Sequence, residues 1–73
     1  MNGTDIMVHF QENLDAKQKN TIESQLREID GVIAPRFNKE HLLLIYYNSD
    51  KTDSSIFMNF FKTTGFQAKL VGL

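Results

Sequence analysis

The chain has 73 residues, of which 41 % are hydrophobic and 23 % charged, with eight Lys and Arg against nine Asp and Glu. A chain of this length has room for one domain with a small core, so we expect a single domain over residues 1–73. The sequence contains no cysteine, which excludes a disulfide scaffold, a zinc–thiolate site and a thiol nucleophile. Its near-neutral charge disfavours nucleic-acid binding, which normally requires a basic face.

The sequence shows no signal for a membrane or for export. Its longest apolar run, residues 42–47, is far shorter than the roughly 20 residues that a spanning helix needs. The first residues lack the basic region and the apolar stretch of a signal peptide. We therefore expect a cytoplasmic protein without membrane insertion.

The first part of the chain combines a predicted strand, residues 5–11, with a predicted helix, residues 13–29. Apolar residues in the strand recur at every second position, which places one set on the core face: Ile6, Val8 and Phe10. Apolar residues in the helix recur at steps of four and three and form one stripe: Ile22, Leu26 and Ile29. Asp15 is suited to cap the helix, with Gln18 reaching back as in a capping box. Gly31 suits the left-handed position after the helix.

The middle of the chain contains two predicted strands, residues 32–37 and residues 41–47, joined by a polar turn. The first includes Pro35, which cannot donate a hydrogen bond to a neighbouring strand, so we expect it at an edge of the sheet. The second contains six consecutive apolar residues, which is typical of a central strand with apolar side chains on both faces.

The last part of the chain combines a helix that ends near residue 64 with a strand over residues 66–72. Thr52 or Asp53 can cap the helix, and Gly65 follows its end. The helix has a wide apolar stripe: Ile56, Phe57, Phe60 and Phe61. The strand has one apolar parity: Phe66, Ala68 and Leu70.

The predicted order of elements is βαββαβ. This order is typical of the α+β class, as a ferredoxin-like sandwich in which a four-stranded antiparallel sheet carries two helices on one face. In that fold the strand order is 4-1-3-2, which places the second strand at an edge and the third in the centre. Both positions agree with Pro35 and with the apolar third strand.

Residues 22–32, with the sequence IESQLREIDGV, resemble the first-helix signature of heavy-metal-associated domains. These are the small domains of copper chaperones, mercury-binding proteins and metal-pumping P-type ATPases, with the pattern apolar-Glu-x-x-Leu-x-x-apolar-x-Gly-Val. Residues 44–48 are similar to the family's third strand, and residues 65–68 to its Gly-Tyr-x-Ala turn. The resemblance spans nearly the whole chain and implies the same sandwich.

The chain departs from this family in the loop before the first helix. The family binds soft metal ions there through a Met-x-Cys-x-x-Cys motif, because soft ions favour sulfur ligands. The resemblance places the two cysteine positions on Asp15 and Gln18, so we expect no thiolate metal site and no cofactor. Asp15 and Gln18 then cap the helix. The alternative is a hard-ion or polar site with Glu12, for which the carboxylates are few.

Two histidines are candidate ligands of another kind. His9 lies near the end of the first predicted strand and His41 at the start of the third. These strands are antiparallel neighbours in the expected sheet, so both histidines are expected at the end that holds the degenerate loop. Together with Glu12 or Asp15 they would suit Zn, Cu(II) or Ni. The alternative is that both side chains simply face solvent.

The third predicted strand must expose apolar side chains on the face that the helices leave open. The two possible sets are Leu42, Leu44 and Tyr46, or Leu43, Ile45 and Tyr47. We assign the second set to the open face, together with Met7 and His9 from the first strand. Such a patch is typical of a surface that binds a protein partner or a second copy of the chain.

The sequence therefore predicts a non-enzymatic, protein-interacting relative of the heavy-metal-associated domains, linked to metal transport by analogy with that family alone. One alternative is a domain that binds metal through His9, His41 and loop carboxylates. A second alternative is a dimeric sensor of a small ligand, which this sandwich also supports. RNA binding is disfavoured because the third strand has two tyrosines but no glycine or basic residue.

Overall fold

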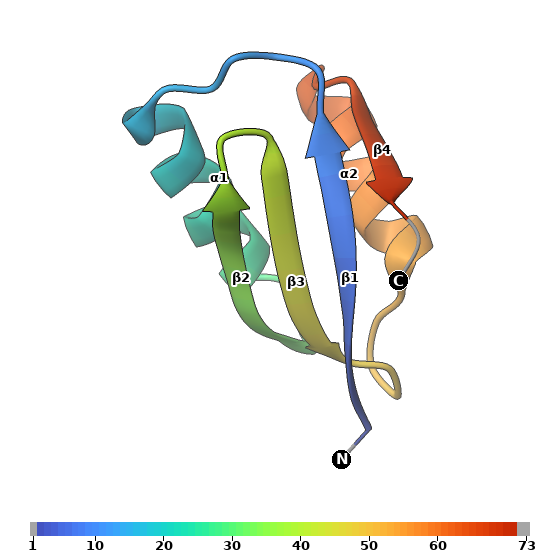
Figure 1. The fold of residues 1–73 in the computed structure, drawn as a ribbon. Helices are drawn as coiled ribbons and strands as arrows, with labels where there is room; N and C mark the ends of the chain where they lie inside the picture. The colour runs from blue at the N-terminus through green and yellow to red at the C-terminus, as the bar shows by residue number, and fades with distance from the viewer. Residues whose placement is uncertain (1, 72–73) are drawn as a thin grey trace.

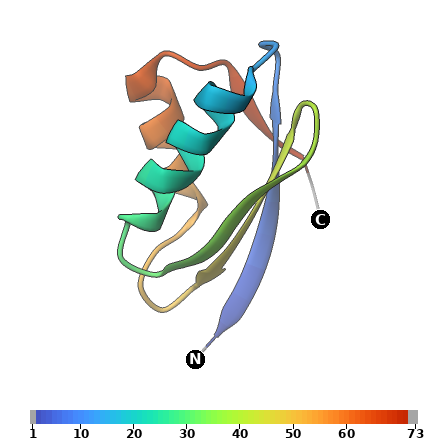
Figure 2. The ribbon, with the colours of Figure 1, turned by 90° about the vertical axis from the view of Figure 1, so that its left-hand side faces the viewer.

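Strands and helices alternate along residues 2–71, which the computed structural model describes. In chain order they are β1 (Gly3–Phe10), α1 (Ala16–Arg27), β2 (Val32–Lys39), β3 (Leu42–Asn48), α2 (Ser54–Thr64) and β4 (Ala68–Val71). All neighbouring strands are antiparallel, in the order β2-β3-β1-β4, and both helices cover the same face of the sheet (Figures 1 and 2). Read from the opposite edge, this is the predicted order 4-1-3-2, so the ferredoxin-like sandwich and its strand order are confirmed.

The core lies between the sheet and the helices. It takes alternate residues from the two central strands: Ile6, Val8, Phe10, Leu43, Ile45 and Tyr47. The helices contribute Ile22, Leu26, Phe57 and Phe61. Phe10 is fully buried, and its ring meets that of Phe61 edge to face at 5.1 Å between centroids. The predicted core face of the first strand is therefore confirmed.

The predicted open face of β3 is wrong. Leu43 and Ile45 are fully buried and Tyr47 is 7 % exposed, so this set faces the helices. The reason is the register with β1, which pairs Val8 with Leu43 and Ile6 with Ile45. Directly paired residues lie on the same face of a sheet, so the inward side chains of β1 take these partners inward with them. The open face belongs to Leu42, Leu44 and Tyr46.

The capping box at the N-terminus of α1 is built as the sequence predicted, although the helix begins at Ala16 and not at residue 13. Asp15 is the N-cap, and its Oδ1 accepts a hydrogen bond from the Gln18 backbone N–H at 2.8 Å. The Gln18 Oε1 accepts the Asp15 backbone N–H at 3.0 Å, which completes the capping box. The predicted C-terminus is wrong by two residues, because α1 ends at Arg27 with Glu28 as its C-cap.

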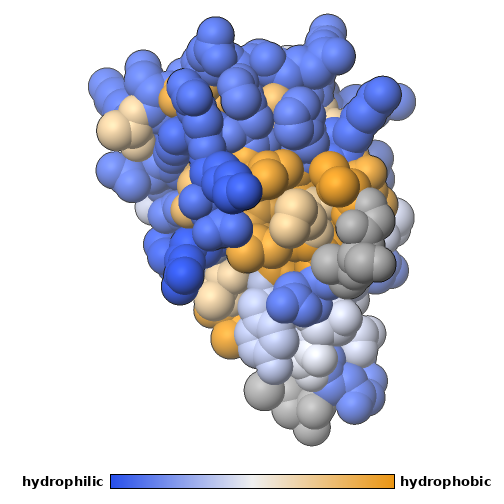
Figure 3. Space-filling view, in the orientation of Figure 1, coloured by the Kyte–Doolittle hydropathy of each residue, from blue (hydrophilic) through white to orange (hydrophobic). Residues whose placement is uncertain are grey.

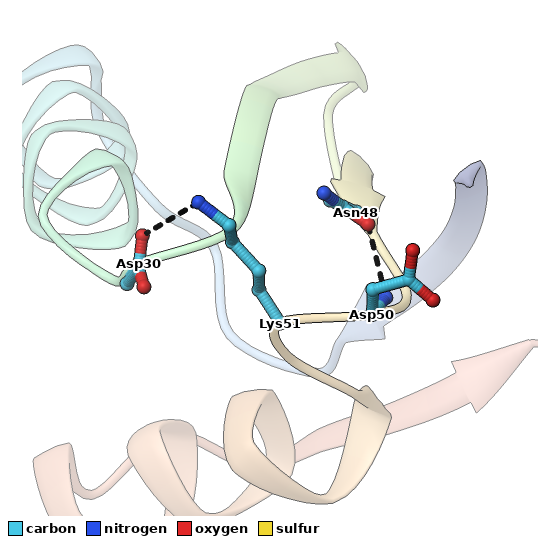
Figure 4. Close-up of polar contacts among 4 residues, drawn as sticks. All are labelled: Asp30, Asn48, Asp50 and Lys51. Atoms are coloured by element: carbon cyan, nitrogen blue, oxygen red, sulfur yellow. Dashed lines mark hydrogen bonds and ion pairs between the residues drawn. The ribbon is translucent and has the colours of Figure 1, made fainter. Parts of the chain in front are cut away.

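Gly31 shapes the entry into β2 rather than the end of α1. Its φ of +100° lies in the left-handed region, and a Cβ there would stand 2.8 Å from the Cβ of Lys51. The loop after β3 therefore packs directly against this glycine. Asp50 donates its backbone N–H to Oδ1 of Asn48 at 2.9 Å, and Lys51 Nζ lies 3.8 Å from Asp30 Oδ1 (Figure 4). This ion pair is exposed and contributes little to stability.

The second helix shows one further correction. Asp53 is its N-cap and Gly65, with φ +89°, its C-cap, as expected. Ile56, however, is 46 % exposed and does not belong to the buried stripe. The core side instead carries Phe57 and Phe61, with Met58 and Phe60 packed against them. The strand predicted over residues 66–72 begins at Ala68, and Gly72 lies outside the described residues.

The outer edge of the sheet at β2 is closed to strand pairing. Pro35 has no backbone N–H, and the Phe37 N–H donates to the Glu23 carboxylate of α1 at 3.0 Å. Pairing with a foreign strand needs such donors, so this edge is a poor template for strand addition. Within residues 2–71, neither helix is long and apolar enough to cross a membrane.

Candidate functional site

The loop between β1 and α1 uses its polar groups for structure. Asp15 and Gln18 satisfy each other's backbone in the capping box. One carboxylate oxygen of Glu12 accepts the Gln67 backbone N–H at 2.7 Å and ties the loop to the start of β4. Across residues 2–71, no group of three or more His, Asp or Glu side chains is arranged to hold a metal ion.

The two histidines do come together at this end of the sheet. Their ring centroids lie 5.8 Å apart and the ring planes are tilted by 35°. His9 is exposed on β1, whereas His41 is half-buried in the turn between β2 and β3 rather than in the predicted strand. His41 Nδ1 lies 3.0 Å from the backbone carbonyl oxygen of Glu12. The proximity expected from the strand order is therefore confirmed, while the role of these rings as ligands stays a prediction.

The open face of the sheet carries an apolar band. Leu44 of β3 pairs with Met7 of β1, and Met7 pairs with Val71 of β4, so the three side chains cross the sheet in one row. Tyr46 and Val71 are 38 % and 39 % exposed. Figure 3 shows this face with an apolar patch at its centre and hydrophilic residues above it and to its left. Met7 and His9 lie on this face as predicted.

Basic side chains border the apolar band. Arg36 pairs with Leu44, Lys39 with Leu42 and Lys69 with His9, and all three cationic residues are exposed. Asp5, which pairs with Tyr46, is the acidic residue of these rows. The open face thus holds three of the eight cationic residues of the chain but one of its nine acidic residues. It is basic, although the chain as a whole has a net charge of −1.

One part of the open face is slightly hollowed. A shallow depression of about 160 Å³ is lined by Asp5, Ala34, Arg36, Leu44 and Tyr46. The Tyr46 ring crosses Gly3, where a Cβ would collide with its hydroxyl group. Sites for drug-sized ligands occupy about 300–1,000 Å³ and enclose most of the ligand. The depression is therefore better suited to one side chain of a partner than to a small molecule.

Sequence reasoning missed the residues that form this face. The sequence prediction assigned the wrong alternating set of β3 to the open face, whereas the set that lies there is Leu42, Leu44 and Tyr46. It also did not include the basic border. The missing signal was the pairing of β3 with β1, because the inward set of β1 fixes the inward set of its neighbour. The cationic residues are scattered along the sequence and gather only when β2 and β4 flank the central strands.

Comparisons with known proteins give matches in structure alone. No family model and no curated protein matches the chain. A copper-binding domain from HMA7, a P-type ATPase, matches with a TM-score of 0.82 and 16 % identity over 93 % of each chain. Oxidised MerP from Ralstonia metallidurans CH34 matches with a TM-score of 0.79 and 9 % identity, over 93 % of this chain and 96 % of that one.

A third solved structure is similar along almost the entire chain. It is the N-terminal domain of a potential copper-translocating P-type ATPase from Bacillus subtilis in its Cu(I)-loaded state. It matches with a TM-score of 0.81 and 24 % identity, over 99 % of this chain and 90 % of that one. These likenesses establish that the chain has the fold of the heavy-metal-associated domains. With no cysteine in its sequence, it lacks their Cys-x-x-Cys motif.

Proposed function

We propose that this chain is a non-enzymatic protein-interaction domain, which uses the open face of a heavy-metal-associated fold instead of a thiolate metal site. The observation that carries the proposal is the apolar row of Met7, Leu44 and Val71 on the face that the helices leave uncovered. An apolar centre within a polar border is the usual anatomy of a protein interface. Small domains of this fold are typically non-catalytic, which agrees with the proposal.

The basic border defines the chemistry of the partner. Arg36 lies at one end of the apolar row, and Lys39 and Lys69 lie in the neighbouring row on one side of it, whereas the row on the other side contains one acidic residue, Asp5. Complementary charge steers two proteins together and fixes their orientation. We therefore propose a partner whose contact surface has an apolar centre with acidic side chains around it. At the β2 side, the closed edge favours contact through the face of the sheet over pairing with that edge strand.

A second copy of the chain fits this face less well. Two open faces brought together would place like-charged borders close to one another, and like charges across an interface cost binding energy. A homodimer is therefore the weaker candidate. A dimeric sensor is weaker still, because the depression on this face is too small for a typical ligand.

The source of the partner is proposed by analogy. Two of the matched structures are domains of P-type ATPases, one of them copper-binding and the other from a potential copper-translocating ATPase, and the third is MerP. We propose that this domain binds a component of a metal-transport system, an inference that rests on shared fold alone. Its location in the cytoplasm stays a prediction from the sequence.

Matched variants of the purified chain test the proposal. The wild-type chain and the variants Leu44→Glu and Arg36→Glu are immobilised, and proteins captured from a lysate of the source organism are quantified by mass spectrometry. We expect one captured protein with an acidic surface to be lost from both variants. Ile56→Glu is the control, because Ile56 is 46 % exposed on α2, away from the open face.

The candidate partner is then purified and titrated into the isotope-labelled chain. Amide shifts should gather on Met7, Leu44 and Val71, and binding should weaken as salt rises. The proposal is wrong if Leu44→Glu binds as well as the wild type, or if Ile56→Glu loses the partner to the same extent. Amide spectra of each free variant confirm that it remains folded.

A further inference from the structure

We infer that His9 and His41 form a surface site for a divalent transition-metal ion, distinct from the degenerate loop positions Asp15 and Gln18. The chain has two histidines in all. The fold brings them together from different elements, β1 and the turn before β3, to a ring separation of 5.8 Å. His9 lies on the open face beside Lys69, so the site adjoins the surface proposed for the protein partner, but the tests below use the free chain and need no partner.

A hydrogen bond prepares His41 as a ligand. A backbone carbonyl oxygen can only accept, so the His41 Nδ1, which lies 3.0 Å from the Glu12 oxygen, must carry the proton. The neutral ring then offers the lone pair of Nε2 to a metal ion. Histidines that bind metals generally donate their other ring N–H to a carbonyl or carboxylate in this way, which fixes both the tautomer and the ring orientation.

The separation of the rings suits a shared ion. With metal–nitrogen bonds of about 2.1 Å, two imidazoles on one ion place their ring centres roughly 5–6.5 Å apart. The observed 5.8 Å lies within this range. His9 is exposed, so its side chain is free to adjust its rotamer, whereas the half-buried His41 is held by Glu12.

The donor set selects the class of metal. Neutral imidazole suits Cu²⁺, Ni²⁺ and Zn²⁺, whereas Mg²⁺ and Ca²⁺ need carboxylate and carbonyl oxygens. The Asp15 carboxylate caps α1, and one Glu12 oxygen accepts the Gln67 N–H, whereas the other Glu12 oxygen is buried without a hydrogen-bond partner. Water completes the coordination, so we expect an exchangeable ion. Cu²⁺ should bind most tightly, following its place at the top of the divalent series.

The first test needs no metal. The ¹⁵N shifts of the His41 ring, recorded at a pH where the ring is neutral, should show a protonated Nδ1 and a bare Nε2. A protonated Nε2 would remove the free lone pair and contradict the site.

The second test is a titration with zinc chloride followed by the ring resonances of both histidines. Both rings should shift together and saturate at one ion per chain. His9→Gln and His41→Gln should each weaken binding roughly tenfold or more. Glu28→Gln is the control, because Glu28 is exposed at the C-cap of α1 and should leave binding as in the wild type. Glu12→Gln tests separately whether the loop carboxylate is a ligand, because the contact of Glu12 with His41 comes from its backbone.

Three outcomes would overturn the inference. One is a shift of a single ring, which indicates an adventitious contact. Another is unchanged affinity in His9→Gln. The third is loss of binding in Glu12→Gln, which would assign the ion to the loop carboxylate. Competition between Cu²⁺ and Zn²⁺ then tests the class of metal, with the expectation that Cu²⁺ displaces Zn²⁺.

Discussion

Asp53 determines where α2 begins. Its carboxylate accepts hydrogen bonds from the Ser55 hydroxyl group and from the backbone N–H groups of Ser55 and Ile56. These bonds satisfy donors that the first turn of a helix leaves free. The Ser55 side chain, followed by the Ile56 backbone N–H, holds the pKa of Asp53 below its usual range.

This lowered pKa predicts a loss of stability in acid. Because the folded-state pKa lies below the unfolded value, the stabilisation is complete above the unfolded pKa and disappears as the pH falls through the folded pKa. Asp53→Asn keeps a capping side chain but cannot titrate. We therefore expect its melting temperature to fall less than that of the wild type between neutral and strongly acid pH, as followed by circular dichroism. Parallel curves for the two proteins would contradict this assignment.

Alternate side chains of β3 have different roles, one set in the core and the other on the open face. Leu43 is fully buried against the helices, while Leu44 lies on the open face beside Met7. Leu43→Ala should destabilise the chain by about 2–5 kcal/mol, as deletions in a packed core do. Leu44→Ala should cost at most about 1 kcal/mol, since it removes contacts from a surface. Urea unfolding of both variants measures the difference, and equal losses would disprove the assignment of faces.

The same strand shows where sequence reasoning succeeds and where it stops. In β1 the β-branched and aromatic residues Ile6, Val8 and Phe10 recur at every second position, with Met7 as the one apolar residue between them, so the pattern alone identified the core face. In β3 six consecutive apolar residues carry no alternation, and both parities fit equally well. Only the pairing with β1 decides which alternating set of β3 side chains is buried. The capping box of α1 could be predicted because its residues are local in the sequence, whereas the basic border of the open face depends on strands far apart in the chain.

In the whole molecule, the two faces of the sheet have different surroundings. One side of the sheet holds the core and both helices, and the other gathers an apolar row within a basic border. The net charge of −1 does not reveal that basic residues gather on the open face. The acidic residues are concentrated elsewhere, in the loops and on the helical side, where Asp15 and Asp53 cap the two helices. The fold thus keeps a basic face on an almost neutral chain.

This distribution of charge predicts how the free chain responds to salt. Two open faces repel each other through Arg36, Lys39 and Lys69, so we expect a monomer at low ionic strength in sedimentation velocity. High salt screens this repulsion, and any weak association through the apolar row should appear there first. Leu44→Glu is the control, because a charge within the row should prevent association at either ionic strength.

The opposite dependence would change the assigned role of the face. A dimer that forms at low salt and dissociates as salt rises would mean that attraction, for example between Asp5 and Arg36 of two copies, outweighs the like charges of the border. The second copy would then replace the acidic partner as occupant of the open face. A monomer at low salt leaves the apolar row uncovered in the free protein, which is the state that a foreign acidic partner requires.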